Sequence, residues 1–253
     1  MAANLRESFR VIAAGRVPGE IRELPGVSIA SAGVTFQMFN AAFLSTPVTG
    51  EAELARRIML PSVHFDARGL EWAYWVCEGW LEARARRRSR QIFARHGLRH
   101  SVDLPGMVAD RILPPVKPLP KLEIRRVGDA VTSDAFCAIG SVCFHVPLTW
   151  FREVFDNDCV WERFICWVGY VDGEPVSTAA AVMGGEAVGV YNVATMPEHQ
   201  KRGYAETVTR HAVAEAQRQY GIEQTVLQST PAGQRLYERM GFRTVTNVAV
   251  YAS

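Results

Sequence analysis

The stretch VYNVATMPEHQKRGYA, residues 190–205, constrains the fold of this chain more than any other segment. It begins with residues that favour a β-strand, and Pro197 breaks that pattern. A helical pattern follows from about Gln200 and continues to about Tyr220. The sequence therefore predicts a strand that leads through a turn into a long helix.

The start of that helix is a candidate binding site for an anion. The first N–H groups of a helix have no partner within it, and the helix dipole places partial positive charge there. Gly203 has no side chain, so a phosphate can approach the backbone closely. Lys201 and Arg202 add two positive charges. Glycine is common near helix starts, so these features alone indicate only a diphosphate-like ligand.

Two motifs make the interpretation more specific. The pattern Q-x-x-G-x-A, which begins at Gln200 and follows V-A-T-x-P, resembles the acetyl-CoA pyrophosphate loop of the GCN5-related N-acetyltransferases, the GNAT superfamily. Residues 236–242 resemble the L-Y-x-x-x-G-F ending of that family's last strand–helix–strand unit. The resemblance covers roughly residues 122–253. It implies an α/β (α+β) protein with the GNAT fold, a mixed and mostly antiparallel sheet flanked by helices.

The resemblance also implies acetyl-CoA as a co-substrate and indicates which residues bind it. In the family, the strand before the loop separates from its neighbour and offers backbone N–H groups to the thioester and pantetheine. Those positions are Val193 and Thr195 here, where the alternative is ordinary sheet pairing. Donors aimed at the thioester oxygen would stabilise the oxyanion that forms during transfer. The remaining donor-binding candidates are Gln200, Lys201, Arg202, Gly203, Tyr204, Ala205, Thr230 and Gly233.

Tyr237 is the candidate general acid, because the family often places a tyrosine at this position. A phenol with a pKa near ~10 can protonate the thiolate that leaves during transfer. The alternative is a core tyrosine that only packs its helix. The general base is not identified: Glu186, Glu162 and His145 are candidates, and attack by a neutral amine needs none.

The segment RILPPVKPLPK, residues 111–121, is the predicted domain boundary, because four prolines make it stiff and extended. Residues 122–253 read as β-α-α-β-β-β-α-β-α-β, which is the GNAT order, with hairpin turns at Asp172-Gly173 and Gly184-Gly185. Residues 1–110 form the other predicted domain. Its expected strands are 26–31, 34–45, 70–77 and 98–110, and its expected helices are 3–14, 51–66 and 80–96, with an early end or a kink at Pro61.

An internal repeat indicates that the two domains are copies of one fold. RQIFARHGLR at 90–99 matches QRLYERMGFR at 234–243 when shifted by 144 positions. Residues 1–110 contain no Q-x-x-G-x-A motif, and Phe93 stands in place of Tyr237. We therefore expect a tandem protein whose degenerate N-terminal half does not bind CoA in this way. That half would complete the sheet or wall the acceptor pocket.

Composition excludes several classes of protein. No run approaches the ~20 apolar residues of a membrane span, and the N-terminus lacks the apolar core of a signal peptide, so we expect a cytoplasmic protein. The five cysteines contain no C-x-x-C pair, which argues against a disulfide framework or a zinc site. They read as buried small hydrophobic residues, and no metal is expected.

Five arginines between Arg84 and Arg90 make the N-terminal half basic. Such a run is either a solvated helix face or a patch for a polyanion such as nucleic acid. Because no aromatic residues are interleaved with it, the sequence favours the solvated face.

Together these features predict an acetyl-CoA-dependent N-acetyltransferase, an acyltransferase that acts on an amine of a small molecule or peptide. The alternative is a catalytically inactive CoA-binding sensor or structural protein. Longer acyl groups remain compatible with the sequence, and the resemblance is compatible with a homodimer.

Overall fold

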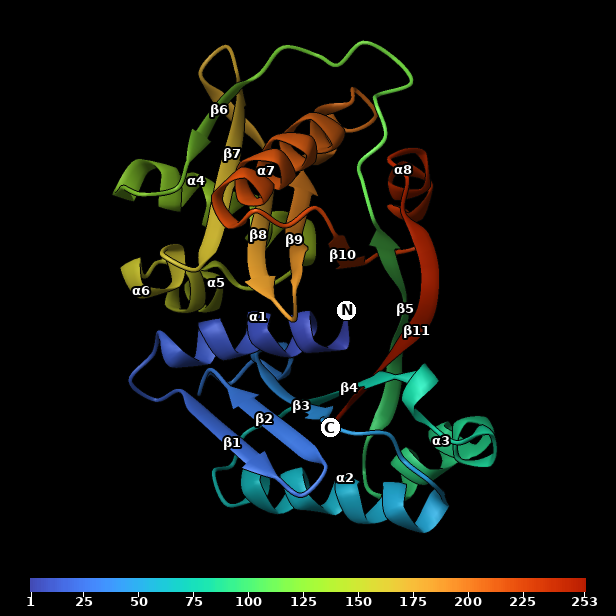
Figure 1. Cartoon of the computed structure of the whole chain (residues 1–253). Coiled ribbons are helices and arrows are strands. Elements are labelled where there is room, and N and C mark those ends of the chain that lie inside the picture. Colours follow the sequence, from blue (N-terminus) through green and yellow to red (C-terminus); the bar gives the residue numbers. More distant parts are fainter.

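The computed structural model describes all residues from 1 to 253, and its strands form a single 11-stranded sheet with helices on both sides (Figure 1). The elements of the N-terminal half follow the predicted order, with one additional edge strand, β1. They are α1 (Ala2–Ala14), β1 (Glu20–Leu24), β2 (Val27–Ser31), η1 (Gln37–Phe39), β3 (Asn40–Leu44), α2 (Glu51–Asp66), β4 (Ala73–Cys77), η2 (Glu78–Trp80), α3 (Ala83–Arg95) and β5 (Arg99–Ala109).

The C-terminal half has the predicted order of strands and helices, with a short extra helix, α6. Its elements are β6 (Glu123–Arg126), α4 (Ala130–Phe144), α5 (Leu148–Phe155), α6 (Asp158–Trp161), β7 (Phe164–Val171), β8 (Glu174–Gly184), β9 (Ala187–Thr195), η3 (Pro197–His199), α7 (Tyr204–Tyr220), β10 (Thr225–Gln228), α8 (Gln234–Arg239) and β11 (Arg243–Ala252). The sequence thus predicted the mixed, mostly antiparallel sheet flanked by helices.

The two halves exchange strands at the centre of the sheet. The strand order is β1-β2-β3-β4-β11-β5-β10-β9-β8-β7-β6. The last strand of the chain, β11, pairs with β4 and β5, and β5 pairs with β10 and β11. Each half therefore ends in a strand that lies between two strands of the other half. The division into domains at 111–121 stays a prediction, and the strands on its two sides belong to one sheet.

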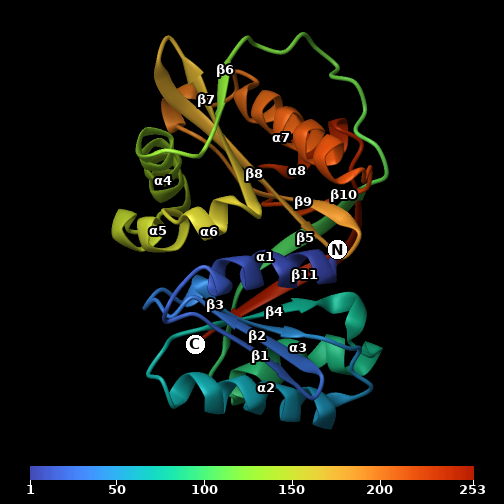
Figure 2. The same ribbon diagram turned by 60° about the vertical axis from the view of Figure 1, so that its left-hand side comes forward.

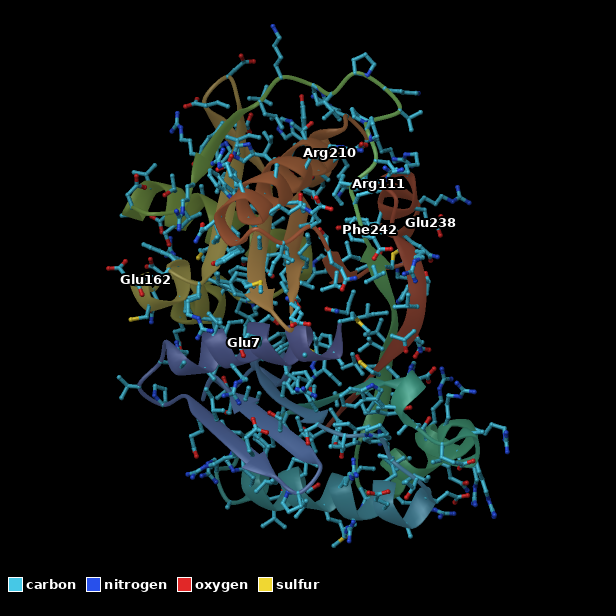
Figure 3. All side chains as sticks on the ribbon, viewed as in Figure 1. Glu7, Arg111, Glu162, Arg210, Glu238 and Phe242 are labelled. Carbon is cyan, nitrogen blue, oxygen red and sulfur yellow. The ribbon has the colours of Figure 1, made fainter.

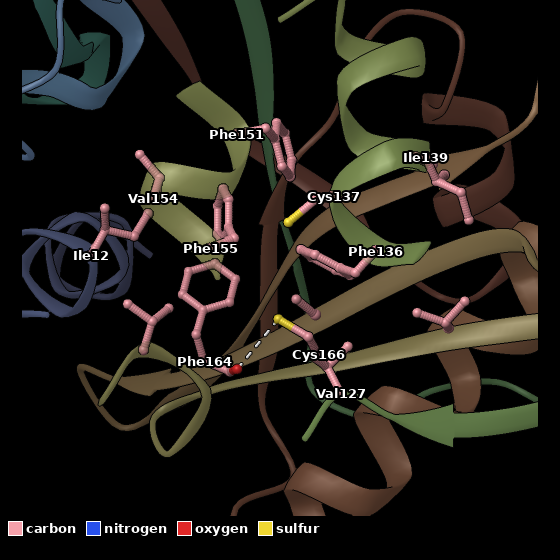
Figure 4. Packing of buried hydrophobic residues seen from close by; sticks show 14 of the residues in the cluster. Ile12, Val127, Phe136, Cys137, Ile139, Phe151, Val154, Phe155, Phe164 and Cys166 are labelled. Carbon is pink, nitrogen blue, oxygen red and sulfur yellow. Dashed lines mark hydrogen bonds between the residues drawn. The ribbon is translucent and has the colours of Figure 1, made fainter. Parts of the chain in front are cut away.

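Helix α1 lies between the halves, as both views show (Figures 1 and 2). Asn4 is fully buried, and its amide Nδ2 donates hydrogen bonds to the carbonyls of Val182, Gly184 and Ala187 at 2.9–3.0 Å. Ile12 of the same helix packs into the core of the C-terminal half, whose aromatic centre Figure 4 shows. The helix thus joins the first half to the β8–β9 hairpin of the second.

Three local expectations were wrong. Pro61 does not end α2 early, because the helix runs unbroken to Asp66. Helix α7 begins at Tyr204 and not at Gln200, because Lys201 and Gly203 before it have φ values of 63° and 87°. Two of the five cysteines are not buried: one is half-buried and one is exposed, namely Cys143 and Cys159.

The basic run lies on α3, where three of its five arginines form ion pairs within the chain. Arg84 and Arg88 both contact Glu51, and Arg90 contacts Asp103. This pairing favours the solvated-face interpretation of the run. None of the helices combines the length and the apolar character that crossing a bilayer requires.

Candidate active site

The C-terminal end of β9 separates from β10. The two strands run parallel only where residues 188–190 face residues 225–227. Beyond that point β9 continues to Thr195, paired with β8 on its other side. Val193 and Thr195 are therefore half-buried beside an opening between two strands. Val193 also packs against the apolar cluster that contains Tyr237, which places the two candidate residues on the same face of the sheet.

A β-bulge shapes this opening, and the sequence analysis did not foresee it. Asn192 has φ 49°, and the pairing of β8 with β9 shifts register between Thr178 and Ala180. The hydroxyl of Thr178 donates to the Asn192 carbonyl at 2.8 Å, and that of Ser177 donates to the Ala194 carbonyl at 2.7 Å. These bonds hold the bulged strand. An asparagine inside a strand was the available signal, because asparagine is rare in strands and tolerates positive φ.

The turn after β9 presents the start of α7 to solvent. Gly203 is the N-cap residue, and no side chain caps the helix. The first hydrogen bond of the helix runs from the Thr207 N–H to the Gly203 carbonyl at 3.1 Å. The N–H groups of Tyr204, Ala205 and residue 206 thus have no acceptor within the helix. The structure therefore has an uncapped helix start at Gly203, a few residues after the start at about Gln200 that the sequence predicted.

The side chains of this turn are mostly exposed. Gln200 donates from Nε2 to the Thr195 carbonyl at 3.3 Å, which ties the turn to the end of β9. Arg202 donates from Nη2 to the Glu198 carbonyl at 3.1 Å. Lys201 and Arg202 are exposed and form no ion pair with a carboxylate, so both keep their charge available for an anion.

The other candidate residues lie in helix α8 or directly before it: Tyr237 is in the helix, and Thr230 and Gly233 precede it. The N–H of Gly233 donates to the Thr230 carbonyl at 3.0 Å, which forms the turn before the helix. The Tyr237 side chain is 7% exposed, and its ring packs edge-on against Phe242 with 5.7 Å between ring centroids. Burial raises the pKa of this phenol, so it stays protonated at neutral pH. Its hydroxyl makes no hydrogen bond within the chain and is free to donate to a ligand.

None of the candidate bases lies beside the opening. Glu186 occupies the β8–β9 turn with φ 59°, at the opposite end of β9 from Thr195. Glu162 follows α6 and His145 ends α4, and both are exposed. Figure 3 shows Glu162 at the α6 edge of the molecule, away from Phe242 and the helix that carries Tyr237.

A hollow of about 480 Å³ lies elsewhere, between α1 and the β8–β9 turn. Its charged side chains neutralise one another: Glu7 pairs with Arg10 and Arg163, and Arg10 also pairs with Glu23. Figure 3 places Glu7 on α1, between the two halves. Apart from Arg6, which donates to the Leu44 carbonyl, the charged residues of this hollow are paired with one another, so the candidate active site is the opening beside β9 and not this hollow.

The corresponding region of the N-terminal half is closed. After β3, the backbone of Val48 bonds on both sides to the segment that follows β4, through its N–H to Trp80 and its carbonyl to Glu82. At the start of α2, the carboxylate of Glu53 accepts hydrogen bonds from the N–H and hydroxyl of Thr49. A carboxylate of the chain itself therefore lies in the first turn of this helix, where its charge would repel a phosphate.

The comparisons with known proteins agree with this geometry. Residues 162–244 match a family model described as an acetyltransferase (GNAT) domain. This range contains the opening, the turn and Tyr237. The chain has the GNAT fold, and residues 162–244 resemble a GNAT domain. No curated protein matches the sequence.

Solved structures resemble the whole chain in fold. A GCN5-related N-acetyltransferase from Kribbella flavida is 17% identical, with 100% of this chain and 95% of that chain covered and a TM-score of 0.75. One from Sphaerobacter thermophilus is 14% identical, with coverages of 90% and 76% and a TM-score of 0.61. A tandem GNAT protein from the clavulanic acid biosynthesis pathway is 12% identical, with coverages of 96% and 87% and a TM-score of 0.58. The predicted tandem GNAT architecture agrees with these likenesses.

Proposed function

We propose that this protein is an acetyl-CoA-dependent N-acetyltransferase with one active site, in its C-terminal half, and that its acceptor is an amine of a small molecule or peptide. The observation that carries the proposal is the uncapped start of α7 at Gly203, which directly follows a strand that has separated from β10. Acyl transfer from acetyl-CoA is the chemistry associated with the GNAT fold, and this opening offers a place for the donor.

The residues of the opening have distinct roles in this proposal. The N–H groups at the start of α7, with Lys201 and Arg202, hold the diphosphate of the donor. Backbone N–H groups of Val193 and Thr195 orient the thioester and stabilise the oxyanion that forms when the amine attacks its carbonyl carbon. The hydroxyl of Tyr237 then gives its proton to the sulfur as the carbon–sulfur bond breaks. Thr230 and Gly233 line the path of the donor beside α8.

In this proposal the acceptor arrives as a neutral amine, because none of the three candidate bases, Glu186, Glu162 and His145, lies beside the opening. An alkyl amine with a pKa near ~10 is mostly protonated at neutral pH. The rate of transfer should therefore rise with pH until the free amine predominates. Acceptors with a lower amine pKa should react faster at pH 7.

Titration of acetyl-CoA into the protein, followed by calorimetry, tests the donor site. Gly203→Glu places a negative charge where the diphosphate binds. The matched control is Gly50→Glu, at the N-cap position of α2 in the other half, where an added side chain meets open space. One site per chain, lost in Gly203→Glu and kept in Gly50→Glu, supports the proposal. No binding, or two sites per chain, contradicts it.

A second function is a CoA-binding protein without turnover, which the position of all three candidate bases away from the opening favours. A panel of amines separates the two functions. Release of free CoA that depends on the amine, together with acetylated product, identifies the transferase. Tight binding of acetyl-CoA without product from any amine between pH 7 and pH 10 identifies the binding protein.

A further inference from the structure

The proline-rich segment 111–121 lies against the start of α7. It leaves β5, runs along the outside of α7 and enters β6, as Figures 1 and 2 show. The Leu113 N–H donates to the Met240 carbonyl at 2.9 Å, and its carbonyl accepts a hydrogen bond from Arg210 of α7. Arg210 and Arg111 mark this part of the path in Figure 3.

The far end of the segment touches the pyrophosphate turn itself. A Cβ atom added to Gly203 would lie 3.1 Å from Cδ of Pro120, so this ring lies within contact distance of the glycine. The segment is therefore a wall of the candidate donor site as well as a connection between the two halves.

Two of the three lysines of the chain adjoin this contact, and the third lies in the same segment. The sequence contains only three, Lys117, Lys121 and Lys201, and all its other basic side chains apart from histidine are arginines. Lys201 lies in the turn before Gly203, and Lys121 directly follows Pro120. Lys117 and Lys121 are exposed, and neither forms an ion pair, whereas arginines supply nearly all the ion pairs of the molecule.

We propose that segment 111–121 forms part of the acyl-donor site and that Lys117 and Lys121 bind the 3′-phosphate of coenzyme A. This inference rests on the proposed function. The N–H groups at the start of α7 can satisfy a diphosphate, but coenzyme A carries a further phosphate on its ribose with close to two negative charges at neutral pH. Lysine suits such a group, because its ammonium is a point charge on a flexible stem.

The distances along the segment fit this role. A proline-rich chain rises about 3 Å per residue, which places Lys117 about 9 Å from Pro120 and within reach of the same ligand. The stiffness of the segment also limits the entropy that is lost when a ligand is bound. Glu206 at the start of α7 competes little for these lysines, because it is paired with Arg210.

The test compares coenzyme A with 3′-dephospho-CoA by calorimetry in three proteins. These are the wild type, Lys117→Gln/Lys121→Gln, and the control Arg86→Gln/Arg87→Gln. The control removes the same charge from exposed arginines of α3 that form no ion pair. We expect the wild type and the control to prefer coenzyme A. The lysine variant should lose about five- to tenfold in affinity for coenzyme A and almost none for dephospho-CoA.

Each outcome has a distinct meaning. If the preference for coenzyme A is the same in the lysine variant and the wild type, the inference is wrong and the proposed function stands. An equal loss of affinity for both ligands contradicts a specific contact with the 3′-phosphate and indicates a general field effect. If the wild type binds neither ligand, the proposed function fails, and the inference with it.

Discussion

Leu104 of β5 and Val248 of β11 lie directly opposite each other, and the repeat makes them equivalent positions of the two halves. The shift of 144 residues that relates the halves converts one into the other. The same shift converts the neighbouring pair Gly106–Thr246 into Val102–Val250. A local two-fold axis therefore passes between the two side chains, and each half is completed by the last strand of the other.

This exchange predicts that the two halves unfold together. Leu104 is 9% exposed and lies where both halves meet, so Leu104→Ala should lower the free energy of unfolding by about 2–5 kcal/mol. Because neither half has its own complete sheet, hydrogen exchange should accelerate in β2–β3 and β7–β8 to the same extent. The control is Val17→Ala, since Val17 is fully exposed. Selective loss of protection in one half would contradict the shared unit.

Much of the fold was predictable from local sequence patterns. The hairpin dipeptides at 172–173 and 184–185 and the glycine after α3 fixed the boundaries of their elements to within a few residues. The 90–99 and 234–243 repeat correctly indicated equivalent helix–strand units. The exchange of β5 and β11 was not predictable. The hydrophobic pattern of a strand indicates that the strand is buried, but it does not indicate which strands pair with it.

Some features of the candidate site were likewise predictable from the sequence, and others were not. The candidate pyrophosphate turn could be predicted, because Gly203 and its neighbours are contiguous in sequence. The bulge at Asn192 depends on the hydroxyls of Ser177 and Thr178, which come from another strand. The contact of Pro120 with Gly203 joins residues more than eighty positions apart. Such contacts follow from tertiary packing, which a single sequence does not display.

Tyr237→Phe should lower the rate of transfer at saturating substrate by about tenfold or more, because the leaving sulfur loses its proton donor. The affinity for acetyl-CoA should change little. The stability should also change little, because the hydroxyl makes no hydrogen bond within the protein. Steady-state kinetics measures the rate of transfer, and calorimetric titration measures the affinity for acetyl-CoA.

The matched control for that variant is Tyr251→Phe, which removes a hydroxyl that donates to Ser89 of α3 at 2.9 Å, away from the candidate site. It should destabilise the protein by about 1 kcal/mol and leave turnover unchanged. Equal turnover in Tyr237→Phe and the wild type would remove the proposed acid role.

The bulge at Asn192 should matter for binding of the donor. A β-branched residue does not readily adopt φ 49°, so Asn192→Val favours a regular strand without the bulge. The register of Val193 and Thr195 would then change, and the affinity for acetyl-CoA should fall by about tenfold or more. Asn192→Gly is the control, because glycine adopts this φ freely. Equal affinities of the two variants would mean that the bulge is not needed for binding.

Glu53 should make stability depend on pH in the acidic range. Hydrogen bonds from the hydroxyl and N–H of Thr49, with a further contribution from Arg57, lower the pKa of this carboxyl to about 2. Its pKa in the unfolded chain is near the usual value of 4.5 for a glutamate. Because the folded state has the lower pKa, the stabilisation is complete above about pH 4.5 and is lost as the pH falls toward about 2.

Glu53→Gln should therefore be less stable than the wild type by about 1–2 kcal/mol at pH 7, since it leaves the buried guanidinium of Arg57 without its carboxylate partner. The difference should shrink between pH 4.5 and pH 2.5, because the Glu53 carboxyl of the unfolded wild-type chain then takes up a proton while that of the folded protein stays mostly charged. Urea unfolding at pH 7, 5, 4 and 3 measures it. Glu162→Gln, at an exposed carboxylate without an ion pair, should match the wild type within about 0.5 kcal/mol throughout. A Glu53→Gln difference that stays constant down to pH 3 would show that the ion pair does not stabilise the fold through its charge.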